Sequence, residues 1–183
     1  MEVWVRSYNS NKFQLLVTYP ICAMSGALGP KRAKGDEQVP EGFYNIDFFN
    51  PNSAYHLSMR IDYPNKRDRL ANVSNRPMGG DIFIHGACKS IGCLAITDSG
   101  IRELYWLSVT ARGYGQERIP VHIFPTRMKD VKDVRKVARL KNYDANMHEF
   151  WQSLKPGYDY FEKTHQVPAV TLDEQGRYVL FSD

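Results

Sequence analysis

The chain has 183 residues, of which 43% are apolar and 24% charged, with a formal net charge of +4 at pH 7. This length suits one well-packed domain and is short for two. The weak positive charge does not argue for nucleic-acid binding, and no stretch approaches the roughly 20 apolar residues of a membrane span.

Four apolar or alternating runs in the first third predict strands that pair as two hairpins: residues 2–7 with 13–19, and residues 43–49 with 55–61. Between the hairpins, residues 25–42 are rich in Gly, Lys, Asp and Pro, which predicts a long irregular loop. Loops of that length inside a compact domain are often functional, so we expect this one beside the functional site.

The middle of the chain predicts a strand, a helix and another strand. After a polar excursion over residues 64–80, the apolar residues 82–84 have the composition of a buried strand. Residues 97–99 (Thr-Asp-Ser) are helix N-cap candidates, and the apolar spacing that follows predicts a helix to Gly113. Residues 119–124 predict a further strand.

The last third predicts helices. Val131, Val134 and Ala138 recur at helical spacing in a basic segment, which is typical of a solvated amphipathic helix. We expect a second helix near residues 147–154, ended by the Pro-Gly pair at 156–157, and a third around 158–163, before an edge strand at 177–181. Five aromatic side chains should pack this extension on the core: Phe150, Trp151, Tyr158, Tyr160 and Phe161.

The segment from Ile84 to Cys93 carries the chemistry, because it puts an imidazole and a thiol on either side of a glycine-containing turn. A neighbouring imidazole lowers the pKa of a thiol and populates the reactive thiolate. We therefore expect Cys93 to be a nucleophile activated by His85, reacting with alkylating reagents well below pH 8. The N–H groups of Gly92 and Cys93 are candidate donors to a developing oxyanion.

The His85-Gly86 pair followed by Ser90-Ile91-Gly92-Cys93 resembles the active-site signature of the L,D-transpeptidase (YkuD-like) family. The likeness covers roughly residues 1–128, and two stretches look most like the YafK-type branch: residues 55–58 and 115–125. Most members differ in two ways. They have a second histidine where this chain has Ile91, and many carry an arginine soon after the cysteine, where this chain reads Leu94-Ala95-Ile96.

The resemblance implies a mainly β (α+β) sandwich or barrel-like catalytic domain over residues 1–128, with residues 129–183 as a helical extension packed on it. It implies that Cys93 attacks an L-centred residue of a peptidoglycan stem peptide, that His85 transfers the proton, and that the Gly86 carbonyl orients the imidazole. It also implies a periplasmic or cell-envelope protein without a cofactor.

Two other functions stay open at this point. One is a hydrolytic carboxypeptidase or amidase that releases a lipoprotein attached to peptidoglycan. The other is a cell-wall-binding module that has lost turnover. Intact His85, Gly92 and Cys93 argue against the second.

Four residues are candidates for substrate binding: Ser90, Tyr55, His56 and Lys31. Ser90 is equally suited to a short-range turn bond, and strand alternation would put His56 and Tyr55 on opposite faces. Three cysteines leave at least one thiol unpaired in an oxidising compartment, and Cys22 and Cys88 are either buried apolar residues or a pair. A zinc site from His85, Cys88 and Cys93 lacks a fourth ligand nearby, so we expect no metal.

Overall fold

The computed structural model describes residues 1–72, 76–129 and 144–181. Its strands and helices follow in this order: β1 (Glu2–Val5), β2 (Gln14–Thr18), β3 (Gly42–Asn50), β4 (Ser58–Ile61), α1 (Lys66–Leu70), β5 (Phe83–His85), β6 (Leu94–Ala95), α2 (Asp98–Gly113), β7 (Pro120–Ile123), α4 (Ala145–Thr164), β8 (Val170–Leu172) and β9 (Tyr178–Leu180).

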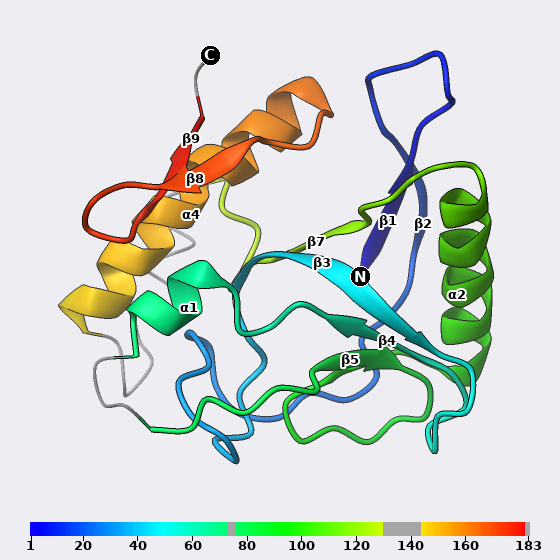
Figure 1. Cartoon of the computed structure of the whole chain (residues 1–183), viewed down its shortest axis with the longest axis horizontal. Helices are drawn as coiled ribbons and strands as arrows, with labels where there is room; N and C mark the ends of the chain where they lie inside the picture. Colours follow the sequence, from blue (N-terminus) through cyan, green and yellow to red (C-terminus); the bar gives the residue numbers. More distant parts are fainter. Residues whose placement is uncertain (73–75, 130–143, 182–183) are drawn as a thin grey trace.

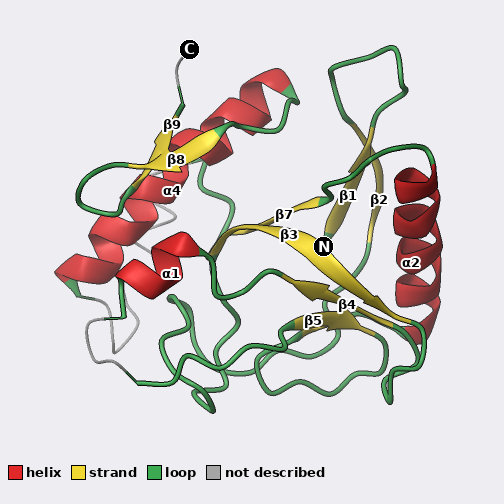
Figure 2. Ribbon diagram, in the orientation of Figure 1, coloured by secondary structure: helices red, strands yellow, loops and turns green. Residues whose placement is uncertain are grey.

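A curved five-stranded sheet in the order β6-β5-β4-β3-β7 forms the centre of the molecule (Figure 1). Its strands pair antiparallel except for β5 and β6, which run parallel. The predicted N-terminal hairpin is present as β1–β2, and β8 pairs with β9 near the C-terminus. Figure 2 shows α2 and α4 on opposite sides of the sheet. The expected mixed α+β fold with a strand-built core is confirmed.

One face of the central sheet is the core. Ile46 of β3, Met59 and Ile61 of β4 and Ile84 of β5 point to this face and are at most 6% exposed. Since successive side chains of a strand point to opposite faces, His85 lies on the other face of β5. The core therefore fixes which side of the sheet carries the candidate base.

Helix α2 begins where the cap residues predict. The Thr97 hydroxyl oxygen accepts a hydrogen bond from the Gly100 N–H at 3.2 Å, and Ile101 and Leu104 pack into the core. A helix anchored in this way follows Cys93 after only a two-residue strand and its cap. Its first turn consequently lies beside the loop that carries the candidate site.

One sequence prediction in the middle of the chain is wrong. Strand β4 begins at Ser58, and the preceding residues form a turn in which His56 has a φ of 73°. The alternation argument for Tyr55 and His56 therefore fails. The polar excursion contains helix α1, whose capping box joins Asn65 and Asp68 through reciprocal hydrogen bonds.

The predicted break at the Pro-Gly pair of the last third is also wrong, because α4 continues through Pro156 as one helix. Buried Trp151 and Leu154 on one side and Tyr158 on the other hold both halves against the protein, and this packing outweighs the lost hydrogen bond. Gly157 lies so close to Phe43 that a Cβ there would meet the ring at 2.5 Å. The glycine marks a close approach, not a helix end.

Aromatic side chains of the C-terminal residues pack against earlier parts of the chain. Phe150, Trp151 and Tyr158 are buried, whereas Tyr160 and Phe161 are half-buried. The Glu41 carboxylate accepts hydrogen bonds from the Trp151 indole N–H at 2.6 Å and from the Gly29 amide at 2.8 Å. The bond from Trp151 connects α4 to the long loop. The predicted basic helix falls mostly on residues 130–143, outside the described residues.

We expect Glu41 to make stability depend on pH. Burial raises the pKa of its carboxyl from 4.5 to about 7. The unfolded chain releases the proton first as pH rises, so the folded state loses stability between pH 4.5 and about 7, by at most about 3 kcal/mol. Urea denaturation of Glu41→Gln should show a flatter pH dependence over this range. Glu37→Gln, in the same loop but exposed, should leave the dependence unchanged; an unchanged profile in Glu41→Gln would contradict this role.

Candidate active site

The histidine of the site is fixed by its own backbone neighbour. His85 ends β5 and is 2% exposed, and its Nδ1 is hydrogen-bonded to the Gly86 carbonyl oxygen. A carbonyl only accepts, so Nδ1 carries a proton, and in the neutral imidazole Nε2 is the nitrogen free to accept one. The Tyr55 ring lies over the imidazole, with ring centroids 4.7 Å apart. Tyr55 therefore covers the candidate base.

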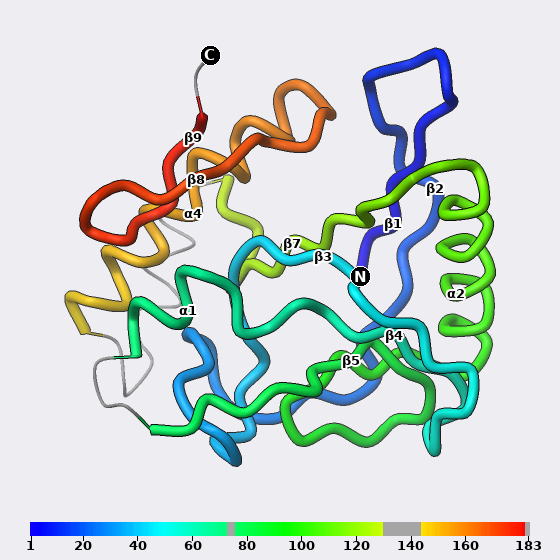
Figure 3. The backbone as a smooth tube through the Cα atoms, viewed as in Figure 1, coloured from blue at the N-terminus to red at the C-terminus, as the bar shows by residue number. Residues whose placement is uncertain are grey.

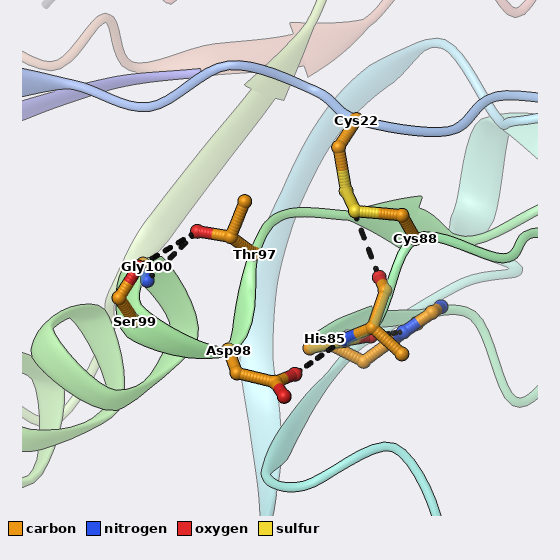
Figure 4. Close-up of a disulfide and its surroundings, with 9 residues drawn as sticks. Cys22, His85, Cys88, Thr97, Asp98, Ser99 and Gly100 are labelled. Carbon is orange, nitrogen blue, oxygen red and sulfur yellow. Dashed lines mark hydrogen bonds between the residues drawn. A yellow bond between two sulfur atoms is a disulfide. The ribbon is translucent and has the colours of Figure 1, made fainter.

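The glycine after the histidine is required by close packing. A Cβ at Gly86 would lie 2.7 Å from the Tyr55 carbonyl oxygen and 2.6 Å from the Asp98 carboxylate. That carboxylate, labelled Asp98 in Figure 4, also accepts a hydrogen bond from the Ala87 N–H at 2.7 Å. Asp98 thus holds the turn that follows the base. Sequence reasoning treated Asp98 only as a cap candidate, because nothing in the spacing shows that it reaches Ala87.

The thiol lies on the same face of the sheet as the histidine. His85 pairs with Ala95 across the parallel strands, and Cys93 stands two residues before Ala95 on the same side. The Cys93 Sγ lies 3.8 Å from the Asp81 carbonyl oxygen. Among the residues that the structure describes, no hydrogen bond joins Sγ to His85. The His85 imidazole and the Cys93 thiol are thus diagonal neighbours across the parallel pairing. The motif suggests a direct contact between them, and the structure shows none among the described hydrogen bonds.

The expected low pKa of the thiol is wrong for the free protein. Burial raises the pKa of Cys93 above its ordinary value, and the nearby Phe83 backbone N–H and Lys31 ammonium only partly oppose this. Burial thus favours the protonated thiol over the thiolate in the free protein. Any attack by sulfur then requires a base that removes the proton during the reaction.

The two amides expected to bind an oxyanion both donate to one oxygen atom of this loop. The Ser90 hydroxyl accepts from the Cys93 N–H at 3.0 Å and from the Gly92 N–H at 3.3 Å, and it donates to the Cys93 carbonyl at 2.7 Å. Of the two roles open for Ser90, the structure shows the turn bond. The amides converge as an oxyanion site needs to, and the hydroxyl occupies the point where they meet.

We expect Ser90→Ala to lower the free energy of unfolding by about 1–3 kcal/mol, because two part-buried amides lose their acceptor. Ser90→Thr keeps the hydroxyl and should recover most of the loss. Urea denaturation of both variants is the measurement. Equal stability of Ser90→Ala and the parent would show that water replaces the hydroxyl without cost.

Lys31 does not project into open space as a substrate-binding residue would. Its ammonium is buried against the Asp36 carboxylate and the Ala33 carbonyl, within the long loop. Gln38 of the same loop reaches the nucleophile turn, where a Cβ at Gly92 would lie 3.1 Å from its carbonyl oxygen. Figure 3 traces this loop beside the segment after β5. The loop is next to the site, as expected, and Lys31 shapes it.

Cys22 and Cys88 form a disulfide, with their Cα atoms 5.3 Å apart, so Cys93 is the free cysteine (Figure 4). The question left open by the sequence is thereby answered in favour of a pair. The bond occupies Cys88, which removes it as a zinc ligand. Within the described ranges, no three His, Cys, Asp or Glu side chains are placed to hold a metal ion. His56 is exposed on its turn.

A cavity of about 960 Å³ opens elsewhere in the molecule. It lies between the N-terminal hairpin, β7 and α4, and it is lined by Ile84 and Leu94 rather than by His85 or Cys93. Those two side chains form a register pair on the core face of the sheet. The cavity is therefore separated from the thiol by the sheet itself.

Comparisons with known proteins show the family of this chain. The family model of the L,D-transpeptidase catalytic domain, YkuD, matches residues 4–123, and the chain belongs to that family. Over 172 residues the chain is 41% identical to "Putative L,D-transpeptidase YafK" of Escherichia coli (strain K12), covering 92% of this chain and 65% of that protein. The chain thus spans about two thirds of the length of this relative.

Two solved structures are also similar. The helical cell shape determining protein Pgp2 of Campylobacter jejuni is 20% identical with a TM-score of 0.39, over 82% of this chain and 62% of that one. Bd1075 of Bdellovibrio bacteriovorus is 24% identical with a TM-score of 0.43, over 67% of this chain and 42% of that one.

In the described part of this chain, no helix has the length and apolar character to cross a membrane.

Proposed function

We propose that this protein is a cysteine-dependent peptidoglycan L,D-transpeptidase that acts through a thioester on Cys93. One observation carries the proposal: the free thiol shares a sheet face with a histidine whose Nδ1 is bound to Gly86 and whose Nε2 is bare. Family membership supplies the reaction class. Gly86 thereby takes the orienting role that a carboxylate has in other triads.

In the first half-reaction, the Cys93 side chain turns from the Asp81 carbonyl toward the imidazole, and Nε2 takes the thiol proton. Sulfur then bonds to the carbonyl carbon of an L-centred residue in a stem peptide. The C–N bond breaks and the imidazolium returns the proton to the leaving amine. The raised pKa of the thiol favours this coupled transfer over a standing thiolate.

The oxyanion needs donors when the tetrahedral intermediate forms. The Gly92 and Cys93 amides already converge on one point, where the Ser90 hydroxyl now stands. We propose that the oxyanion displaces that hydroxyl and takes over both hydrogen bonds. In the second half-reaction an acceptor bonds to the thioester carbonyl carbon while His85 takes its proton. The C–S bond then breaks, and the imidazolium returns the proton to sulfur, which restores the thiol.

The acceptor is an amine in the transpeptidase that we propose, and water in a hydrolase that would release a lipoprotein from peptidoglycan. We propose that the protein acts in the cell envelope, where stem peptides occur. The disulfide supports an oxidising compartment such as the periplasm, because cytosolic thiols are mostly kept reduced.

Mass spectrometry of purified muropeptides incubated with the protein tests the proposal. Cross-linked products that depend on Cys93 are expected. Trimmed products alone would show hydrolysis in place of transfer, and unchanged muropeptides at every protein concentration would refute an enzymatic role.

A further inference from the structure

A row of side chains leads across the sheet to the thiol. Phe48 of β3 pairs with Arg60 of β4, and Arg60 pairs with Phe83 of β5. Cys93 comes next, because the register that pairs Ile84 with Leu94 sets Phe83 beside it. All four therefore lie on the face opposite the core, and a peptide bound at the thiol along this row would pass over Arg60.

Arg60 is held by Asp47 on one edge and forms a looser ion pair with Asp81 on the other. Its Nε and Nη2 donate to the Asp47 carboxylate at 3.0 and 3.2 Å, and its guanidinium lies 5.5 Å from the centre of the Phe48 ring. The remaining nitrogen, Nη1, forms an ion pair with the Asp81 carboxylate at 3.7 Å, longer than the two contacts with Asp47.

Asp81 connects this cation to the thiol. Its side chain is 81% exposed and is ion-paired with the Nη1 edge of Arg60, while its carbonyl oxygen lies 3.8 Å from Cys93 Sγ. The residue has a φ of 57°, in the left-handed region. The Arg60 guanidinium and the exposed Asp81 carboxylate therefore lie next to each other, and the backbone of Asp81 contacts the candidate nucleophile.

We propose that the Nη1 edge of Arg60 and the Asp81 carboxylate together bind a zwitterionic group of the acyl donor, a carboxylate and an ammonium on one carbon atom. Guanidinium geometry suits a carboxylate, and the carboxylate of Asp81 takes the ammonium. Asp47 and Phe48 hold Arg60 in place. This inference rests on the proposed function and assigns its specificity to two residues outside the His85–Cys93 motif.

Binding to the Cys93→Ala protein tests the inference without turnover. Isothermal titration would compare two stem peptides that carry diaminopimelate, one with its free zwitterionic end and one with that carboxylate amidated. We expect the free form to bind about 10-fold more tightly, the scale of one charge-assisted pair at a partly exposed site. Arg60→Gln in the same background should make the two affinities equal. Arg102→Gln, an exposed arginine on α2, should leave the difference unchanged.

A second pair of ligands isolates Asp81. Acetylation of the ammonium of the zwitterion should weaken binding to the parent and have no effect in Asp81→Asn. Arg60→Lys keeps the charge without the planar fork and should recover only part of the discrimination. Circular dichroism melts of each variant check that the fold is kept.

Three results would overturn the inference: equal affinity for the free and amidated peptides with Arg60 present, a difference that survives Arg60→Gln, or no measurable binding of either peptide. The proposed function fails separately. If the parent protein discriminates between the peptides through Arg60 yet converts neither, the recognition site stands and the transpeptidase assignment does not.

Discussion

Cys93→Ala is expected to reduce turnover by about 10⁴-fold or more, because no other group of the site forms the covalent intermediate. The side chain is half-buried in the turn just before β6, and the change removes one sulfur atom and little packing. Muropeptide conversion followed by mass spectrometry is the measurement. Thiol titration of the denatured protein, without reductant, should give one free thiol for the parent and none for the variant.

The paired cysteines provide a control for this substitution. Replacing Cys22 and Cys88 together by Ala should leave a substantial fraction of the activity at low temperature, since neither sulfur touches the substrate in the proposed reaction. The double variant should nevertheless be less stable by about 2–5 kcal/mol, because the disulfide closes a 66-residue separation. Parent-like turnover in Cys93→Ala, or a double variant that folds but is as inactive as Cys93→Ala, would refute the proposed nucleophile.

His85→Gln is expected to lower kcat/KM by about 10²–10⁴-fold, the usual loss for a general base. Glutamine keeps a hydrogen-bonding group beside the Gly86 carbonyl but cannot take a proton from the thiol. The raised pKa of Cys93 makes this base necessary, since little thiolate is present without it. The measurement is the rate of thioester formation in a single turnover.

Tyr55→Leu is the matched control for His85→Gln, because it removes the ring over the imidazole and leaves the base. Its effect should be clearly smaller than that of His85→Gln. Alkylation of Cys93 at high pH should proceed in both variants, which shows that the nucleophile turn keeps its shape. A single-turnover rate in His85→Gln within a factor of three of the parent would mean that another group accepts the proton.

The sequence determined those features that depend on local pattern. Apolar or alternating runs located the strands around Ile46 and Ile84, and the Thr97 cap located α2, because hydrophobic patterning and capping act over a few residues. The family assignment also came from a short motif, since the residues from His85 to Cys93 are close in the chain.

Local patterns failed where distant contacts decide the outcome. Pro156 predicts a helix end, yet burial of Trp151 and Tyr158 holds α4 together across it. The turn at His56 replaces a predicted strand, and Tyr55 covers His85 as a result of that turn.

The chemistry of the thiol was likewise decided by the tertiary structure. Spacing alone puts an imidazole near Cys93 and suggests a lowered pKa, whereas burial raises it. Arg60 stands 33 positions before Cys93, and only the pairing of β4 with β5 and of β5 with β6 brings it to the same row. Hydrogen bonds between strands can pair residues whatever the length of chain between them. Residues that are far apart in the sequence can therefore become neighbours in the sheet.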